Sequence, residues 1–334
     1  MTSLASGSLR AGLGPACMLP LPAMSILVSG SVALDHIMVF PDRFANHILP
    51  DQVHTLNVSF NITSLDTHFG GVAANIAYHL RHLGADPLIL ATVGSDFGPY
   101  AEWLDRHGVR RDGIRVFDDV RTPQGFVTTD KEDCQIWAFY EGAMARAHEA
   151  RVEDVDEPVE LAIVSANGKQ AMLDHARALK QRGVPTYIDP SHGLPILSRE
   201  ELLELIDGAA GYFVNDYEWK LTLEQTGQSE QEIEARCDSV IITRGAEGSE
   251  IRSDGASLEI PPSKVAKVVD PTGCGDAYRA GYLFGLASGK SLDVAGRLGS
   301  VLGGWQVEVE GAQALSYDAE AFRKRFEESF GSGF

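Results

Sequence analysis

The chain of 334 residues has few cysteines, and no apolar run in it approaches the ~18 residues of a membrane-spanning helix. A helical transmembrane protein is therefore excluded. The cysteines form no Cys-x-x-Cys pair, which argues against a disulfide framework and predicts a reduced, cytoplasmic protein. They are Cys17, Cys134, Cys237 and Cys274.

Basic residues are also scarce. Lys and Arg number 28 against 47 Asp and Glu, which gives a formal net charge of −19 and a pI near 4.9. Because such a field repels phosphate backbones and anionic lipids, the composition argues against nucleic-acid and membrane partners. A small anionic substrate stays compatible with it, since backbone amides can form a local anion site in an acidic protein.

Several nucleotide-binding signatures are missing. No Gly-x-x-x-x-Gly-Lys-[Ser/Thr] occurs, which excludes a Walker-type kinase. Asp96-Phe97-Gly98 matches the magnesium triplet of protein kinases, but no His-Arg-Asp loop accompanies it. Gly30 lacks the later glycines of a dinucleotide-binding fingerprint.

Residues 1–23 are rich in Ser, Gly, Ala and Pro and contain one Arg. Gly14, Pro15 and Pro20 interrupt their apolar stretch, so the segment does not fit a secretory signal. We expect a disordered tail or an upstream start codon, with Met24 opening the folded protein.

From Met24 onward, short apolar runs alternate with helical periods. One helix is expected from Ala73 to Leu83, with Gly84 placed to stop it. The alternation predicts an α/β fold: a doubly wound, mostly parallel sheet flanked by helices, with ligands beyond the carboxyl ends of the strands. The expected buried strands are 25–29, 88–93, 161–165, 186–188, 212–214 and 240–243.

Two segments break this rhythm. Residues 36–68 place apolar side chains near a period of two, and residues 121–142 contain two extended runs around a polar turn. These patterns fit either an ordinary edge hairpin or a small β-sheet lid over the ligand end of the main sheet. We expect a lid made of these two segments. The α/β core would then comprise residues 24–35, 69–120 and 143–330.

The most specific motif runs from Asp270 to Gly281. Gly273 and Gly275 flank one small residue where a helix should start, so backbone N–H groups can approach an anion there. Asp276 follows in the expected first turn. An anion site beside a carboxylate is what phosphoryl transfer to a hydroxyl requires, although a capping carboxylate after a glycine-rich turn is the simpler alternative.

This motif resembles the second signature of the ribokinase-like carbohydrate and nucleoside kinases, the PfkB family. The resemblance extends from Met24 to about Phe330. It implies a ribokinase-like fold with a β-sheet lid, and Asp276 as the catalytic base. It also implies an anion hole formed by Gly273, Cys274 and Gly275.

Two further motifs match those that bind the substrate in that family. The segment from Gly70-Gly71 to Asn75 is similar to the first signature, in which paired glycines let a sugar approach a helix start. Asp35 matches the carboxylate that grips sugar hydroxyls. The resemblance thus assigns these four residues to substrate binding.

The motifs that bind the nucleotide in that family are matched as well. Asn215 and Glu218 fit the N-x-x-E motif, where the carboxylate acts on Mg²⁺ through water. The segment with Thr243, Gly245 and Gly248 resembles the one that lines the ATP site. The loop of Asp270 and Thr272 matches a monovalent-cation site, so the implied cofactors are Mg²⁺, ATP as co-substrate and K⁺.

Within the family, the chain looks most like bacterial adenosine kinases, which are purine-salvage enzymes. Phe126 and Phe139 match aromatic positions that clamp the purine there, and Ser31 and Asp35 match ribose contacts. The alternative is that these rings only pack the lid or a homodimer interface through it. The partners implied are ATP and a nucleoside or sugar.

The acceptor stays open at this point. Another nucleoside such as inosine, or a free sugar such as ribose or fructose, fits the same motifs. The chain also departs from the adenosine kinases at His192-Gly193, where amide side chains are usual. A protein of this fold that only bound nucleotide or sugar would have no need of a base at Asp276.

Three other positions have two interpretations each. His79 and His82 are three apart on one expected helix and suit either a shared metal or a packed pair. Cys274 suits a low-pKa thiolate or a small spacer whose N–H matters. Arg279 suits a phosphate contact or a pair with an acid.

The composition of residues 1–23 leads to a test by truncation. Because the segment has no periodic apolar face, a chain that begins at Met24 is expected to keep its melting temperature and activity. Calorimetry and a turnover assay on both lengths check this. A large loss in either measurement would show that the tail packs on the fold or completes the site.

Overall fold

The computed structural model describes residues 25–48, 57–132 and 134–331. The expected tail, residues 1–23, lies outside the described residues, as does part of the first lid segment.

A nine-stranded sheet forms the centre of the molecule, in the order β13-β12-β11-β10-β9-β8-β1-β4-β5. The strands from β11 to β5 in this order run parallel, and β12 and β13 add antiparallel pairs at one edge. This confirms the predicted mostly parallel α/β sheet. The strands are β1 (Ser25–Ser29), β4 (Asp86–Gly94), β5 (Ile114–Phe117), β8 (Leu161–Ser165), β9 (Thr186–Asp189), β10 (Gly211–Asn215), β11 (Ser239–Thr243), β12 (Ser249–Ser253) and β13 (Ala256–Ile260).

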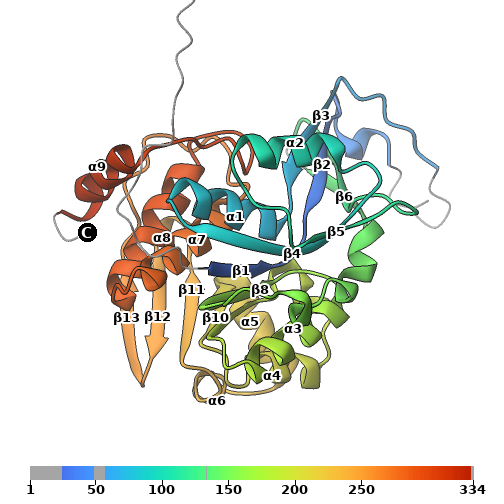
Figure 1. The fold of residues 1–334 in the computed structure, drawn as a ribbon. Coiled ribbons are helices and arrows are strands. Elements are labelled where there is room, and N and C mark those ends of the chain that lie inside the picture. Colours follow the sequence, from blue (N-terminus) through green and yellow to red (C-terminus); the bar gives the residue numbers. More distant parts are fainter. Residues whose placement is uncertain (1–24, 49–56, 133, 332–334) are drawn as a thin grey trace, which may run out of the picture.

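Helices cover both faces of this sheet (Figure 1). The three central residues of β1 are all apolar because helices cover both faces of the strand: Ile26 and Val28 pack toward α1, α7 and α8, whereas Leu27 packs toward α3 and α4. No helix in the described ranges is long and apolar enough to cross a membrane. The helices are α1 (Val72–His82), α2 (Gly98–Arg106), α3 (Lys169–Gln181), α4 (Arg199–Ile206), α5 (Asp216–Thr226), α6 (Glu230–Glu234), α7 (Cys274–Ala287), α8 (Leu292–Gln306) and α9 (Ala319–Phe330).

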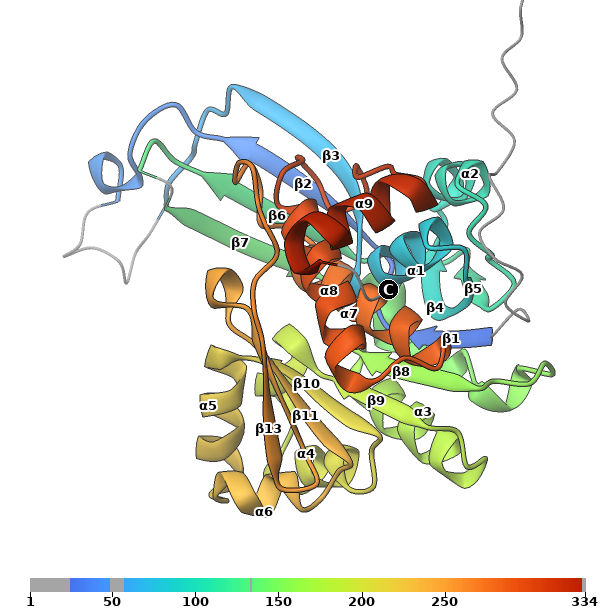
Figure 2. The same cartoon turned by 90° about the vertical axis from the view of Figure 1, so that its left-hand side faces the viewer.

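A second sheet of four strands, in the order β3-β2-β6-β7, extends away from the main sheet as a separate layer (Figure 2). Because β1 ends at Ser29 and β2 begins soon after it, this sheet starts at the carboxyl end of a main-sheet strand, as expected for a lid. The pair of β2 and β3 extends slightly beyond the expected segment 36–68, whereas β6 and β7 lie within the expected segment 121–142. The strands are β2 (Ala33–Val39), β3 (Ser64–Gly70), β6 (Gln124–Thr129) and β7 (Gln135–Tyr140).

Helices α7 and α8 pack with their backbones in close approach. A Cβ added at Gly281 would lie 2.6 Å from the Leu298 carbonyl oxygen, and one at Gly299 would lie 2.8 Å from the Tyr278 carbonyl oxygen. Glycine at these positions therefore sets the distance between the helices.

Replacing Gly281 with alanine tests this contact. Although alanine favours helix, the added methyl group must displace the backbone of α8, so Gly281→Ala is expected to lower the free energy of unfolding by about 1–3 kcal/mol. Gly98→Ala is the matched control, because a Cβ at the first residue of α2 would meet open space. Chemical denaturation measures both variants, and equal stabilities would contradict the packing argument.

Candidate active site

Helix α7 begins with a glycine that no other residue replaces easily. Gly273, its N-cap, has a left-handed backbone with φ of 74°, and a Cβ there would lie 2.5 Å from that of Ala312. The Cys274 N–H donates to the Pro271 carbonyl oxygen at 3.2 Å. Within the described residues, the N–H groups of Gly275 and Asp276 have no backbone acceptor. These two amides, at the positive end of the helix, can bind an anion.

Asp276 lies beside those amides in the first turn of α7. Its burial raises the pKa of the carboxyl to about 6, while the nearby Arg279 cation and a hydrogen bond from Asn75 oppose that shift. The Asn75 Nδ2 donates to Asp276 Oδ2 at 2.8 Å. A carboxylate with this pKa can accept a proton near neutral pH.

A hydrogen-bonded chain orients Asn75. The Gln313 side-chain amide donates to Asn75 Oδ1 at 2.9 Å and to the Tyr100 hydroxyl at 2.6 Å. Tyr100 in turn donates to the Gly70 carbonyl oxygen at 2.8 Å, and the Trp103 indole donates to Gln313 Oε1 at 2.9 Å. The chain links the paired-glycine segment to the carboxylate of α7.

Asp35 occupies a space that two glycines leave open. A Cβ at Gly70 would lie 2.2 Å from Asp35 Oδ2, and one at Gly125 would lie 2.9 Å from Oδ1. Burial raises the pKa of the Asp35 carboxyl, while His68 and His36 lower it. The Asp35 carboxylate also raises the pKa of Asp276, so the two carboxyls share one electrostatic environment.

Ser31 and Gly71 shape the start of α1. The Ser31 hydroxyl accepts the Val72 N–H at 3.1 Å, and so it caps the helix. Gly71 has φ of 91°, and a Cβ there would lie 2.6 Å from the Ala33 nitrogen. The structure thus gathers Ser31, Asp35, Gly70, Gly71 and Asn75 around the start of α1, on the side of Asp276.

The four positions predicted for the nucleotide and Glu218 lie at the carboxyl ends of β10 and β11. Asn215 and Thr243 are paired neighbours across these strands. Asn215 Oδ1 accepts the Glu218 N–H at 2.8 Å, and Glu218 Oε2 accepts the Asn215 N–H at 2.8 Å, which forms a capping box at the start of α5. Gly245 and Gly248 have positive φ in the turn after β11.

Glu218 also has the surroundings expected of a residue near a hydrated metal. Burial raises the pKa of its carboxyl, and the neighbouring Asp189 raises it further. A divalent cation nearby would favour the charged form, and oxygen donors are those that Mg²⁺ prefers. The residues present therefore fit Mg²⁺ held through water.

Asp270 and Thr272 form a tight loop before α7. Asp270 Oδ1 accepts the Thr272 N–H and Oδ2 accepts the Gly311 N–H, both at 2.9 Å. Nearby, Gln306 donates to the carbonyl oxygens of Thr272 and Gly311, and its own Oε1 is buried with no partner in the described part. A set of oxygens with an unpartnered acceptor fits a monovalent cation.

The two predicted clamp rings lie on opposite faces of the lid sheet. Phe126 stacks on His36 with ring centroids 4.7 Å apart. Phe139 pairs with Gly125, and Gly125 pairs with Asp35, so Phe139 shares the face of Asp35. One chain therefore does not present both rings to the same base.

Four further residues of the site were not predicted from the sequence: Trp137, Gln313, Tyr100 and Asp189. Trp137 is 60% exposed and lies 3.8 Å from the position of a Cβ at Gly125, which places it on the Asp35 face. The period of two in β7 could have revealed it as a neighbour of Phe139. The other three have no local motif, because their partners are distant in sequence.

The positions with two interpretations are resolved by their surroundings. His79 is buried with its pKa lowered to about 3, and His82 stacks on Tyr78; no group of three metal-ligating side chains occurs among the described residues. Burial raises the pKa of the Cys274 thiol, so it is not a thiolate of low pKa. Arg279 pairs with Asp189.

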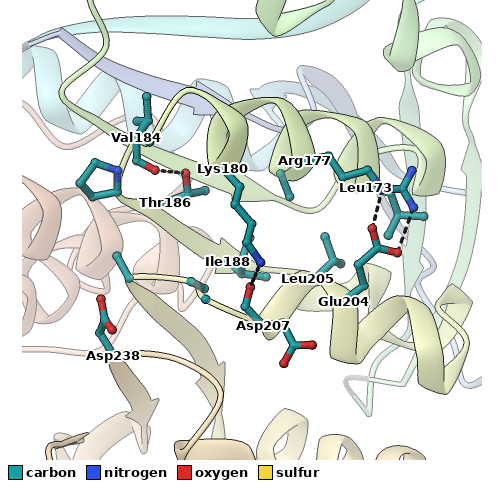
Figure 3. A pocket seen from close by; sticks show the side chains of 16 residues that line it. Leu173, Arg177, Lys180, Val184, Thr186, Ile188, Glu204, Leu205, Asp207 and Asp238 are labelled. Atoms are coloured by element: carbon teal, nitrogen blue, oxygen red, sulfur yellow. Dashed lines mark hydrogen bonds and ion pairs between the residues drawn. The ribbon is translucent and has the colours of Figure 1, made fainter.

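A separate cavity of about 320 Å³ lies elsewhere, between α3 and α4 (Figure 3). It includes Thr186, the first residue of β9, and so lies at the amino end of that strand, away from Asp189. Its two cationic side chains already have partners: Arg177 pairs with Glu204, and Lys180 donates to the Asp207 carbonyl oxygen at 2.9 Å. It is not part of the candidate active site.

Known proteins resemble this chain in sequence and in structure. A sequence profile of the pfkB family carbohydrate kinases matches residues 30–319. The nucleoside kinase of Methanocaldococcus jannaschii is 30% identical over 259 residues, 77% of this chain and 85% of that protein. The probable fructokinase-6, chloroplastic, of Arabidopsis thaliana is 28% identical over 244 residues, 67% of this chain and 63% of its own length.

A solved structure is similar over almost the whole chain. It is Burkholderia thailandensis nucleoside kinase in complex with inosine, with a TM-score of 0.84 and 38% identity, covering 92% of this chain and 99% of that one. The same kinase in complex with ADP-inosine has a TM-score of 0.81 and 42% identity, covering 92% of this chain and 96% of that one.

The fold and the site define a phosphotransferase that acts on a hydroxyl group. The chain belongs to the pfkB family of carbohydrate kinases, with nucleoside kinases among its relatives.

Asp276 is the residue to test first. Asp276→Asn keeps the shape of the side chain but removes the ionisable carboxylate, so turnover is expected to fall by about 10²–10⁴-fold if this group accepts the hydroxyl proton. Calorimetry and nucleotide titration should show an unchanged fold and unchanged nucleotide binding. Turnover close to that of the unmodified enzyme would remove Asp276 from the mechanism.

Proposed function

We propose that the protein is an ATP-dependent kinase that phosphorylates the 5′-hydroxyl of a nucleoside, with adenosine as the preferred acceptor, giving AMP and ADP. The observation that carries this proposal is the Asp276 carboxyl, with its pKa of about 6, beside the Gly275 and Asp276 N–H groups at the start of α7, which have no backbone acceptor within the described residues. We further propose that the enzyme works in the cytoplasm, in keeping with the three free cysteines of the described residues.

In this mechanism the acceptor hydroxyl lies between Asp35 and Asp276. Asp35 accepts hydrogen bonds from the ribose hydroxyls, because its carboxylate has glycines on both sides. Asp276 takes the proton of the 5′-hydroxyl as that oxygen attacks the γ-phosphorus in line. The bond between the γ-phosphorus and the β–γ bridging oxygen breaks at the same time, and ADP leaves with that oxygen. The Gly275 and Asp276 N–H groups stabilise the charge on the transferred phosphoryl group.

Two cations complete the proposed site. Glu218 would hold Mg²⁺ through water, and Asp270 and Thr272 would hold K⁺ beside the anion hole. When bound, Mg²⁺ neutralises charge on the phosphates. Asn215, Thr243, Gly245 and Gly248 would line the ATP site at the ends of β10 and β11. ATP is supported by the ADP-inosine complex of the similar Burkholderia kinase.

The acceptor is proposed from the lid. A flat base needs an apolar surface to stack on, and Phe139 and Trp137 offer exposed rings on the Asp35 face. A free sugar would need no such surface. Inosine is a second candidate, because the Burkholderia relative was solved with it.

The lid also suggests a homodimer. Strand β7 is an edge strand with exposed Ile136, Trp137, Phe139 and Tyr140, an arrangement that a partner strand or sheet usually covers. Since Phe126 and Phe139 lie on opposite faces, a clamp that uses both rings would take one from each copy.

A panel of acceptors tests the proposal. ATP consumption measured with adenosine, inosine, ribose and fructose is expected to show activity with the nucleosides alone. Phe126→Ala and Phe139→Ala should raise the KM for adenosine, since each removes stacking of about 1–3 kcal/mol. Phe60→Ala is a control, because that ring packs on Phe40 and Phe44 instead.

Robust phosphorylation of ribose or fructose with adenosine inert would replace this proposal with a sugar kinase. A preference for inosine over adenosine would keep the nucleoside kinase and change its acceptor.

A further inference from the structure

Arg279 and Asp189 form an ion pair in the interior, next to the candidate active site. Arg279 lies one turn along α7 from Asp276 and is 6% exposed, and Asp189, the last residue of β9, is 0% exposed. Arg279 Nη2 donates to Asp189 Oδ1 at 2.5 Å. Burying two charges costs solvation free energy that their attraction often does not return in full. Stability alone is therefore a poor explanation for the pair.

The pair is also incompletely hydrogen-bonded. Asp189 Oδ2 and Arg279 Nε are both buried and have no hydrogen-bond partner in the described ranges. A structural ion pair normally satisfies such atoms. Because these two atoms are not hydrogen-bonded, the charges of Asp189 and Arg279 can act on neighbouring ionisable groups.

The guanidinium of Arg279 lies against the backbone of Gly275, a residue of the proposed anion hole. A Cβ at Gly275 would lie 2.8 Å from Arg279 Nη1, so the guanidinium fills the space that this glycine leaves open. On another side, Arg279 Cζ lies 5.4 Å from the centre of the Phe213 ring. The guanidinium is thus held between the backbone of Gly275, the Asp189 carboxylate and the Phe213 ring.

Arg279 is the cation that acts on several acidic groups here. It lowers the pKa of Asp276, Glu218 and Cys274, whereas Asp189 raises the pKa of Asp276 and Glu218. The charged and titratable groups that face Asp276 come from four elements and act through space. They are Arg279 and Cys274 on α7, Asp189 at the end of β9, Asp35 on β2 and, through Arg279, Glu218 on α5.

We propose that Arg279 and Asp189 are positioning residues of the phosphoryl-transfer site. Arg279 supports the Gly275 backbone and keeps Asp276 ionised, and Asp189 fixes the guanidinium and offsets part of its charge, so that Asp276 remains a base. This inference rests on the proposed function, in which Asp276 accepts the hydroxyl proton.

The test is the acidic limb of kcat/KM against pH, which reports the ionisation of Asp276 in the free enzyme. Arg279→Met removes the neighbouring cation, so the limb should move about one pH unit higher. Asp189→Asn removes a carboxylate and leaves the cation, so the limb should move lower. In the double variant the two changes should largely cancel.

Two controls separate charge from packing. Arg279→Lys keeps the charge but not the planar fork, so the limb should stay in place while kcat falls. Arg297→Met removes an arginine on α8 that pairs with Asp293. This variant should leave both kcat and the pH of the acidic limb unchanged. If Arg279→Met does not fold, Asp189→Asn and Arg279→Lys decide the question.

A limb at the same pH in every folded variant, or shifted in the same direction by both single changes, would overturn the inference. So would a rise in the KM for ATP alone, which would make Arg279 a direct phosphate contact. Failure of the proposed function gives a different result: Asp276→Asn would retain turnover. If only the inference fails, Asp276→Asn still loses turnover and the limb of the unmodified enzyme persists.

Discussion

The burial of one ionisable carboxylate at the start of a helix is the constraint on which this site depends. Burial makes the Asp276 carboxyl basic, because it disfavours the charged form, and excessive burial would leave it protonated at neutral pH. The Asn75 hydrogen bond and the Arg279 cation limit that effect. The close contact of α7 with α8 and the chain from Gln313 to Asn75 hold these groups in place.

The glycines of the site are explained by what occupies the space beside them. Gly70 and Gly125 make room for the Asp35 carboxylate, and Gly275 makes room for the Arg279 guanidinium. In each case a charged group lies against bare backbone, where a Cβ would collide with it. The glycine-rich motifs thus serve the protein's own side chains as well as the approach of a ligand.

Asn215-x-x-Glu218 shows how one motif can serve two purposes. Its side chains close a capping box that starts α5, and this alone would explain the pattern. The same box holds the Glu218 carboxylate at the carboxyl ends of the parallel strands, near Asp189 and Arg279. A stable helix start thereby presents an acidic group where ligands of such sheets bind.

Six of the nine strands of the main sheet, helix α1, the lid hairpin and the glycine turn before Asp276 were determined by the sequence alone, because each follows from periodicity or from spacing along the chain. Strands β5, β12 and β13, at the two edges of that sheet, were not predicted. Only the tertiary structure decided that Asp189 pairs with Arg279 across 90 positions and that Gln313 reaches Asn75 across 238. It also decided that Phe126 and Phe139 face opposite sides, since strand register sets which side chains share a face. Local pattern determines elements, whereas contacts between distant residues set the charge and orientation of the groups in the candidate active site.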